Sequence, residues 1–190
     1  MITLLSAAMM AIAPVADEPQ TLGACVWSRL APAEQQQILT AYERSVASGM
    51  SALNHRDLKV MAAAPACAGR SDLPPMWVRS AVAAHVIQTG AASVVLSEKG
   101  LDRARLDAAW DAAPIDARNC TLANAAKVFD IDGPACADRR APQAFASGLG
   151  LDHSVRADRK ASEQALIYMN AKAQELIALT LIARAPSPHP

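Results

Sequence analysis

The sequence has few aromatic residues. Trp, Tyr and Phe number 3, 2 and 2 among 190 residues, whereas alanine is by far the commonest residue. Aromatic and β-branched residues favour strands, and alanine is the strongest helix former, so this composition argues against a β-sheet protein. We therefore expect an all-α fold, a small helical bundle of about five to seven helices, cross-linked by disulfides as argued below.

The chain also lacks an excess of charge of either sign. Lysine and arginine together number 18, and so do aspartate and glutamate. Proteins that bind nucleic acids or anionic membranes through bulk electrostatics depend on such an excess. The sequence therefore predicts no nucleic-acid partner. With 52% apolar residues, the composition is that of a folded domain rather than a disordered chain.

Recognisable catalytic motifs are missing as well. The sequence contains no G-x-S-x-G, no P-loop and no dinucleotide-binding fingerprint. Its cysteines form no C-x-x-C pair, and its histidines have no partner at i+4, so the spacing of zinc sites is absent. We therefore predict no catalytic residues, no cofactor and no metal site.

One short stretch matches a catalytic motif without its context. Residues 55–59, His-Arg-Asp-Leu-Lys, spell the start of the protein-kinase catalytic loop. That loop needs an asparagine five residues after its aspartate to hold magnesium, and Ala62 occupies this position. No glycine-rich loop precedes the stretch. We interpret it as a helix surface on which Leu53, Leu58 and Met61 form an apolar stripe.

His85 is the histidine with the most unusual surroundings. It lies in an apolar run from Met76 to Leu96, which predicts a helix at the centre of the domain. Arg79 falls on another face of that helix, and Gln88 is a neighbour at i+3. Since buried polar groups are normally satisfied, we expect a neutral, hydrogen-bonded core residue. An enzyme would instead need a cleft that joins His85 or His55 to a carboxylate and a nucleophile.

The N-terminal stretch has the composition of an export signal. Residues 1–16 carry no charge and no strongly polar group, end in small residues and precede an acidic pair. This composition predicts a signal peptide. The stretch is too short for a permanent membrane anchor, and the alternative is a buried N-terminal helix. Residues 22–25, Leu-Gly-Ala-Cys, resemble a lipoprotein processing box. Polar residues separate this box from the apolar stretch, so we do not expect acylation.

The four cysteines are widely separated and even in number. Behind an export signal, this pattern predicts two disulfides. Three pairings are compatible with the sequence. We favour Cys25–Cys67 with Cys120–Cys136, because each bridge then joins neighbouring elements, and expect each to contribute roughly 3 kcal/mol. The alternative is four free thiols in a cytoplasmic protein.

Helix signals follow one another along the rest of the chain. Prolines at helix starts, apolar residues at helical spacing and glycines or prolines at helix ends define the segments. The expected helices cover about residues 32–49, 50–64, 76–96, 101–112, 115–129, 143–147 and 158–183. We predict one all-α domain over residues 17–184 and a disordered tail over residues 185–190.

These expectations lead to a functional hypothesis. We predict an exported protein, periplasmic or secreted, that serves as a binding or interaction module without catalytic activity. Its partner would be an unknown protein or small molecule of the cell envelope, and no transmembrane anchor would remain after processing. Two alternatives stay open. One is a cell-envelope hydrolase with a site assembled from distant residues, and the other is a cytoplasmic helical protein with free thiols.

Overall fold

The fold is all-α, as predicted. A computed structural model describes residues 21–132, 136 and 140–185, apart from the side chain of Arg140. The predicted signal peptide and most of the predicted tail lie outside these residues. The described residues form nine α-helices and one 3-10 helix: α1 Leu22–Ser28, α2 Pro32–Arg44, α3 Val46–Asn54, α4 Asp57–Ala68, α5 Pro75–Lys99, α6 Arg103–Ala112, α7 Ile115–Ala126, η1 Lys127–Phe129, α8 Arg140–Gly148 and α9 Arg159–Arg184.

The described part of the chain thus has more helices than the five to seven expected, for a local reason. Residues 22–28 form α1, a short helix that the sequence pattern did not indicate. Further along, extended backbone at Ser45 separates α2 from α3, and a non-helical Arg56 separates α3 from α4. Breaks of one or two residues leave the apolar pattern of the flanking segments almost unchanged, so composition and periodicity do not locate them.

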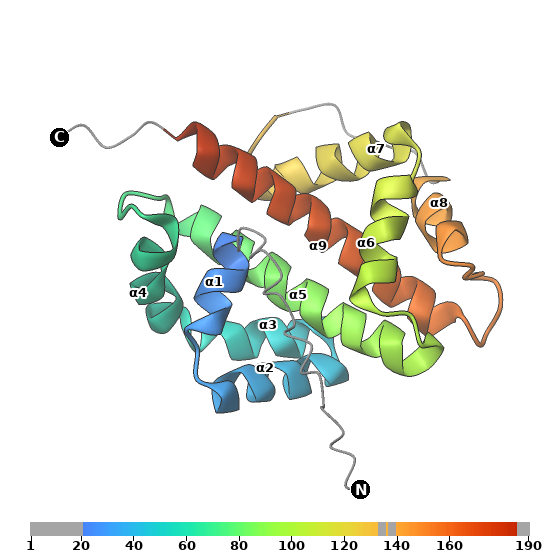
Figure 1. Cartoon of the computed structure of the whole chain (residues 1–190), viewed down its shortest axis with the longest axis horizontal. Coiled ribbons are helices and arrows are strands. Elements are labelled where there is room, and N and C mark those ends of the chain that lie inside the picture. Colours follow the sequence, from blue (N-terminus) through green and yellow to red (C-terminus); the bar gives the residue numbers. More distant parts are fainter. Residues whose placement is uncertain (1–20, 133–135, 137–139, 186–190) are drawn as a thin grey trace, which may run out of the picture.

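The two longest helices form the centre of the bundle. Helices α5 and α9 make the most extensive helix–helix contact in the described structure, with α1–α4 on one side of the pair and α6–α8 on the other (Figure 1). Both helices are rich in buried small residues: Ala81, Ala84, Gly90 and Ala91 in α5, and Ala165, Ala171, Ala173 and Ala178 in α9. Small side chains let two helix axes approach closely, which explains the long contact.

Helix α5 is also long and apolar enough to cross a membrane by length and composition. In the bundle, 56% of its apolar window is buried, and helices pack against it from both sides. A helix that is apolar on most sides is expected at the centre of a globular core. The packing therefore agrees with the central position that the sequence predicts for residues 76–96.

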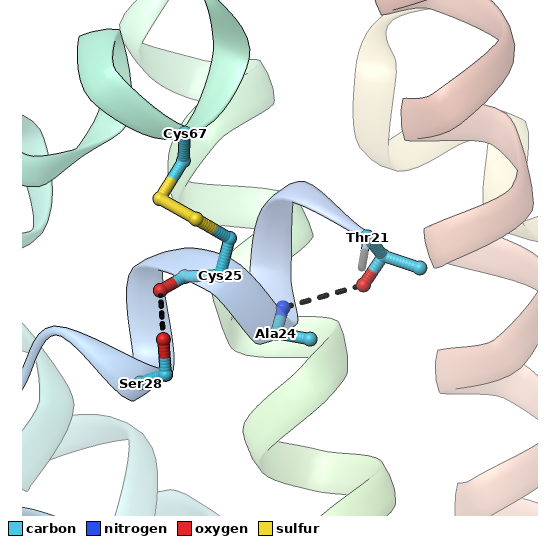
Figure 2. Close-up of a disulfide and its surroundings, with 5 residues drawn as sticks. All are labelled: Thr21, Ala24, Cys25, Ser28 and Cys67. Atoms are coloured by element: carbon cyan, nitrogen blue, oxygen red, sulfur yellow. Dashed lines mark hydrogen bonds between the residues drawn. A yellow bond between two sulfur atoms is a disulfide. The ribbon is translucent and has the colours of Figure 1, made fainter. Parts of the chain in front are cut away.

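Helix α1 is held at both ends of its first turn. The Thr21 hydroxyl accepts a hydrogen bond from the backbone N–H of Ala24 at 3.2 Å, and the Cys25–Cys67 disulfide joins α1 to α4 (Figure 2). A second disulfide joins Cys120 of α7 to Cys136. Both predicted pairings are therefore confirmed. Because Cys25 is bonded to Cys67, its sulfur is not available for the lipid attachment that residues 22–25 superficially suggest.

Two expectations about the α3–α4 region were wrong. The predicted helix over residues 50–64 ends at Asn54, and α4 then runs through Pro65 to Ala68. Pro65 removes one backbone donor, but the helix continues for only three further residues before Gly69, at φ +67°, ends it. The break at Arg56 also changes the helical phase. As a result Leu58 is 87% exposed, whereas Leu53 is buried, and no continuous apolar stripe joins them.

The core of the α6–α8 side is built on aromatic residues. Trp110 stacks on Phe145 with ring centroids 5.5 Å apart, and both side chains are buried. Leu106, one turn before Trp110, is fully buried, which confirms the inner pair that their i, i+4 spacing indicates. Stacked aromatic side chains bury large apolar areas, so these few residues account for much of the core on this side.

Gly90 is the position where the core leaves no room for a methyl group. A Cβ atom at this position would lie 2.4 Å from Cδ1 of Tyr42, a residue that is only 3% exposed. We expect Gly90→Ala to destabilise the protein by about 1–3 kcal/mol, because overpacking outweighs the higher helix propensity of alanine. Chemical denaturation measures this difference.

Gly148→Ala is the matched control for the same experiment. The nearest atom to a Cβ there is 3.9 Å away, so alanine should be neutral or slightly stabilising. In a Tyr42→Leu background, Gly90→Ala should cost less than in the native protein. An equal cost in both backgrounds would show that the Tyr42 ring is not the obstacle.

Candidate functional site

A helical hairpin on the α1–α4 side carries a surface hollow with polar and cationic residues in its lining. Helices α2 and α3 are joined by Ser45 alone, whose hydroxyl accepts a hydrogen bond from the N–H of Ser48 at 3.0 Å and caps α3. Close contacts occur both near the link, between Tyr42 and Gly49, and far from it, between Gln37 and Arg56. The two helices therefore run antiparallel along each other.

A groove of about 860 Å³ lies between these two helices. Its lining combines small side chains, which leave the space open, with longer polar ones. The small residues are Ala33, Thr40, Ala41, Ser48, Ser51 and Ala52, and the longer residues are Gln36, Gln37, Arg44, His55 and Arg56. None of the described residues that line the groove is acidic, and none is Trp, Tyr or Phe. The lining thus offers hydrogen-bond donors and positive charge to a ligand.

Arg56 is held in place at one end of the groove. Its guanidinium donates to Oε1 of Gln37 at 2.7 Å and to the carbonyl oxygen of Ala52 at 3.4 Å. Glu34 lies 3.7 Å away but is shared, because Lys59 donates to the same carboxylate oxygen at 2.6 Å. The hydrogen bond from Lys59 lowers the pKa of Glu34 below its ordinary value. One carboxylate therefore faces two cations here, and positive charge is in excess.

Arg44 occupies the opposite end of the groove. It belongs to the last turn of α2, its side chain is exposed, and it forms no ion pair within the described residues. A cation in the last turn is favoured by the helix dipole, but this effect does not neutralise it. Both ends of the groove can therefore attract an anionic group.

The kinase-like residues do not form a catalytic arrangement. The Nδ1 atom of His55 donates to the carbonyl oxygen of Ser51 at 2.6 Å, and His55 is one of the residues that line the groove. Asp57 accepts two hydrogen bonds from Arg79 of α5, each 2.7 Å long, and this partner lowers the pKa of Asp57. Lys59 pairs with Glu34. The side chains diverge toward three partners, as expected for a helix surface.

Two other hollows differ in character. A groove of about 470 Å³ between α7 and α9 is mainly apolar and includes Leu122, Ile177 and Leu181. A third, of about 650 Å³, includes Asp152, His153 and Ser154. These three residue types suggest a hydrolytic triad, but the Ser154 hydroxyl donates to Asp152 at 2.7 Å. In the described structure His153 bonds to neither residue, so no base is positioned to activate the serine.

A buried polar cluster links α1, α5, α6 and α9, and sequence reasoning missed it. Glu175, only 5% exposed, accepts hydrogen bonds from the Thr21 hydroxyl at 2.7 Å and from Nε2 of Gln88 at 3.0 Å. The side-chain oxygen Oε1 of Gln88 accepts a hydrogen bond from Arg103 at 3.2 Å. Glu175 follows buried Tyr168 by seven residues and so lies on the same face of α9. This spacing was the signal in the sequence that could have predicted its burial.

His85 lies beside this cluster, in the core rather than in a groove. It is 8% exposed, its ring centroid is 6.3 Å from that of Trp27, and its Nδ1 atom has no hydrogen-bond partner among the described residues. Burial lowers the pKa of His85, and the charge of Arg103 lowers it further, while Glu175 opposes the shift. The neutral form is thus favoured, as expected, but Nδ1 lacks a partner among the described residues, although a hydrogen-bonded side chain was expected.

The state of His85 predicts a pH dependence of stability. Because the folded protein disfavours the imidazolium that the unfolded chain accepts, stability present above pH 6.5 is lost as the pH falls below this value. One proton contributes a slope of at most about 1.4 kcal/mol per pH unit. His85→Leu should flatten the unfolding free energy between about pH 7 and about pH 5, and exposed His55→Gln should not. An unchanged slope in His85→Leu would contradict the assignment.

Comparisons with protein-family models, with curated proteins and with solved structures give no match to this chain.

Proposed function

We propose that this chain is an exported binding module of the cell envelope, periplasmic or secreted and without catalytic activity. Its site is the groove between α2 and α3, and its ligand is anionic. The observation that carries the proposal is the groove lining, in which Arg44 and Arg56 stand at opposite ends with no acidic lining residue among those described. Amide and hydroxyl groups between the two arginines supply further hydrogen-bond partners.

The two disulfides support the compartment in this proposal. Disulfides persist in oxidising compartments and are rare in the cytosol of most cells. The apolar composition of residues 1–16 supports export in addition.

The groove proposal is tested by titrating the oxidised full chain with poly-L-glutamate and following backbone amide shifts by NMR. We expect the shifts to concentrate on α2 and α3 and to weaken with added salt. Arg44→Gln should weaken binding by about 3- to 10-fold, because one charge-assisted contact is lost, and Arg44→Lys should recover part of it. Poly-L-lysine should not bind.

Arg105→Gln is the matched control. Arg105 is likewise an exposed arginine, but it lies on α6, away from the groove. Its replacement removes the same net charge and should leave binding unchanged. If Arg44→Gln and Arg105→Gln weakened binding equally, the effect would come from net charge alone and not from the groove. Amide shifts centred outside α2 and α3 would refute the proposed site.

A further inference from the structure

The two arginines of the groove lie at a definite spacing along α2. The guanidinium of Arg56 donates a 2.7 Å hydrogen bond to Gln37, so it lies beside Gln37 of α2. Arg44 follows Gln37 by seven residues. At 1.5 Å per residue, the backbone positions of Gln37 and Arg44 are about 10 Å apart along the groove, and this distance sets the spacing of its two cationic ends at the level of the backbone. A ligand that pairs with both must carry two anionic groups at a similar separation.

The lining between the arginines restricts the class of ligand. It consists of small hydroxyl and methyl side chains such as Thr40, Ala41, Ser48 and Ala52. The described lining residues include no Trp, Tyr or Phe, so the ring of His55 is the one aromatic surface that they offer to a base. Small residues between two antiparallel helices instead allow the backbone of a third helix to approach closely.

From these observations we infer that the groove binds an acidic α-helical segment of a partner protein, with carboxylates at positions i and i+7. This inference rests on the anion-binding function proposed above and adds the chemistry of the partner. Seven residues return a helix to nearly the same face and advance it by about 10 Å, which matches the spacing of Arg44 and Arg56. His55 precedes Arg56 in the chain, also lines the groove and offers a further polar contact at this end.

The test compares two synthetic helices of equal charge. Both are capped alanine-rich peptides with two glutamates, placed at i, i+7 in one and at i, i+4 in the other, with helicity matched by circular dichroism. Both pairs lie near one face of the helix, so only the separation of the carboxylates differs. Binding to the oxidised full chain is measured by calorimetry at low salt.

We expect the i, i+7 peptide to bind about 5-fold more tightly than the i, i+4 peptide, because only the first reaches both arginines. In Arg44→Gln this preference should disappear, whereas in Arg105→Gln it should remain. Equal affinities for the native protein, both lowered by Arg44→Gln, would overturn the spacing inference and leave the anion-binding function standing. Affinities that Arg44→Gln does not change, or no binding of either peptide together with no binding of poly-L-glutamate, would overturn both.

Discussion

Replacing Cys25 and Cys67 by alanine is expected to lower the free energy of unfolding by about 4 kcal/mol. The two residues are 42 apart in sequence, and the chain-entropy model gives a loss of this size for a loop of that length. The physical reason is also local. Helix α1 has only 7 residues and carries the buried Val26 and Trp27, and the disulfide ties it to α4. Chemical denaturation with urea measures the loss.

The second disulfide supplies the comparison for this prediction. Cys120 and Cys136 are separated by 16 residues, so replacing both by alanine should cost about 3 kcal/mol, less than the first pair. Hydrogen exchange should also show α1 opening more readily in the Cys25/Cys67 variant alone. A larger loss from the Cys120/Cys136 pair would contradict the expected order.

Replacing Glu175 by alanine is expected to destabilise the protein by about 3 kcal/mol. The change removes the carboxylate that accepts the hydrogen bonds of the Thr21 hydroxyl and of Nε2 of Gln88, and a hydrogen bond to a charged group contributes about 1.5–3 kcal/mol. Because Thr21 also caps α1, the first turn of α1 should lose protection from hydrogen exchange. Thermal and chemical unfolding give the size of the effect.

Two further variants isolate the cause of the Glu175 effect. Glu175→Gln keeps the shape and one acceptor oxygen, so it should cost about 1 kcal/mol, less than alanine. Glu163 lies on the same helix but is exposed, and Glu163→Ala should change stability by no more than about 0.5 kcal/mol. If Glu175→Ala were as mild as Glu163→Ala, the buried cluster would not hold α1 against α5 and α9.

The fold class, the central helix and the disulfides could be predicted from the sequence because each depends on a short-range or compositional signal. Alanine content indicated helices, the apolar run over residues 76–96 indicated the core helix, and the cysteine spacing indicated neighbouring pairs. Leu106 and Trp110 followed from one helical turn of spacing. These signals are either properties of the composition or patterns within one segment, and the cysteine pairs needed only the order of the four cysteines along the chain.

Two features that escaped prediction, the buried cluster and the groove, depend on contacts between distant residues, and a third, the exposure of Leu58, depends on a break in the helix. Glu175 is buried because Thr21 and Gln88, 154 and 87 residues away, supply its hydrogen bonds. Leu58 is exposed because a break at Arg56 changed the phase of the following helix. The α2–α3 groove required both the one-residue link at Ser45 and the antiparallel packing of two faces that appear only polar in sequence.

The proposed function requires that the protein is exported and that both disulfides are formed. The most direct test is the intact mass of the protein purified from its native cells, with thiols alkylated before any reduction. We predict a chain that lacks about the first sixteen residues and carries no alkyl group, because export removes the signal peptide and oxidation pairs all four cysteines. A full-length chain with four alkylated cysteines would contradict the compartment, the cross-links and the proposed function together.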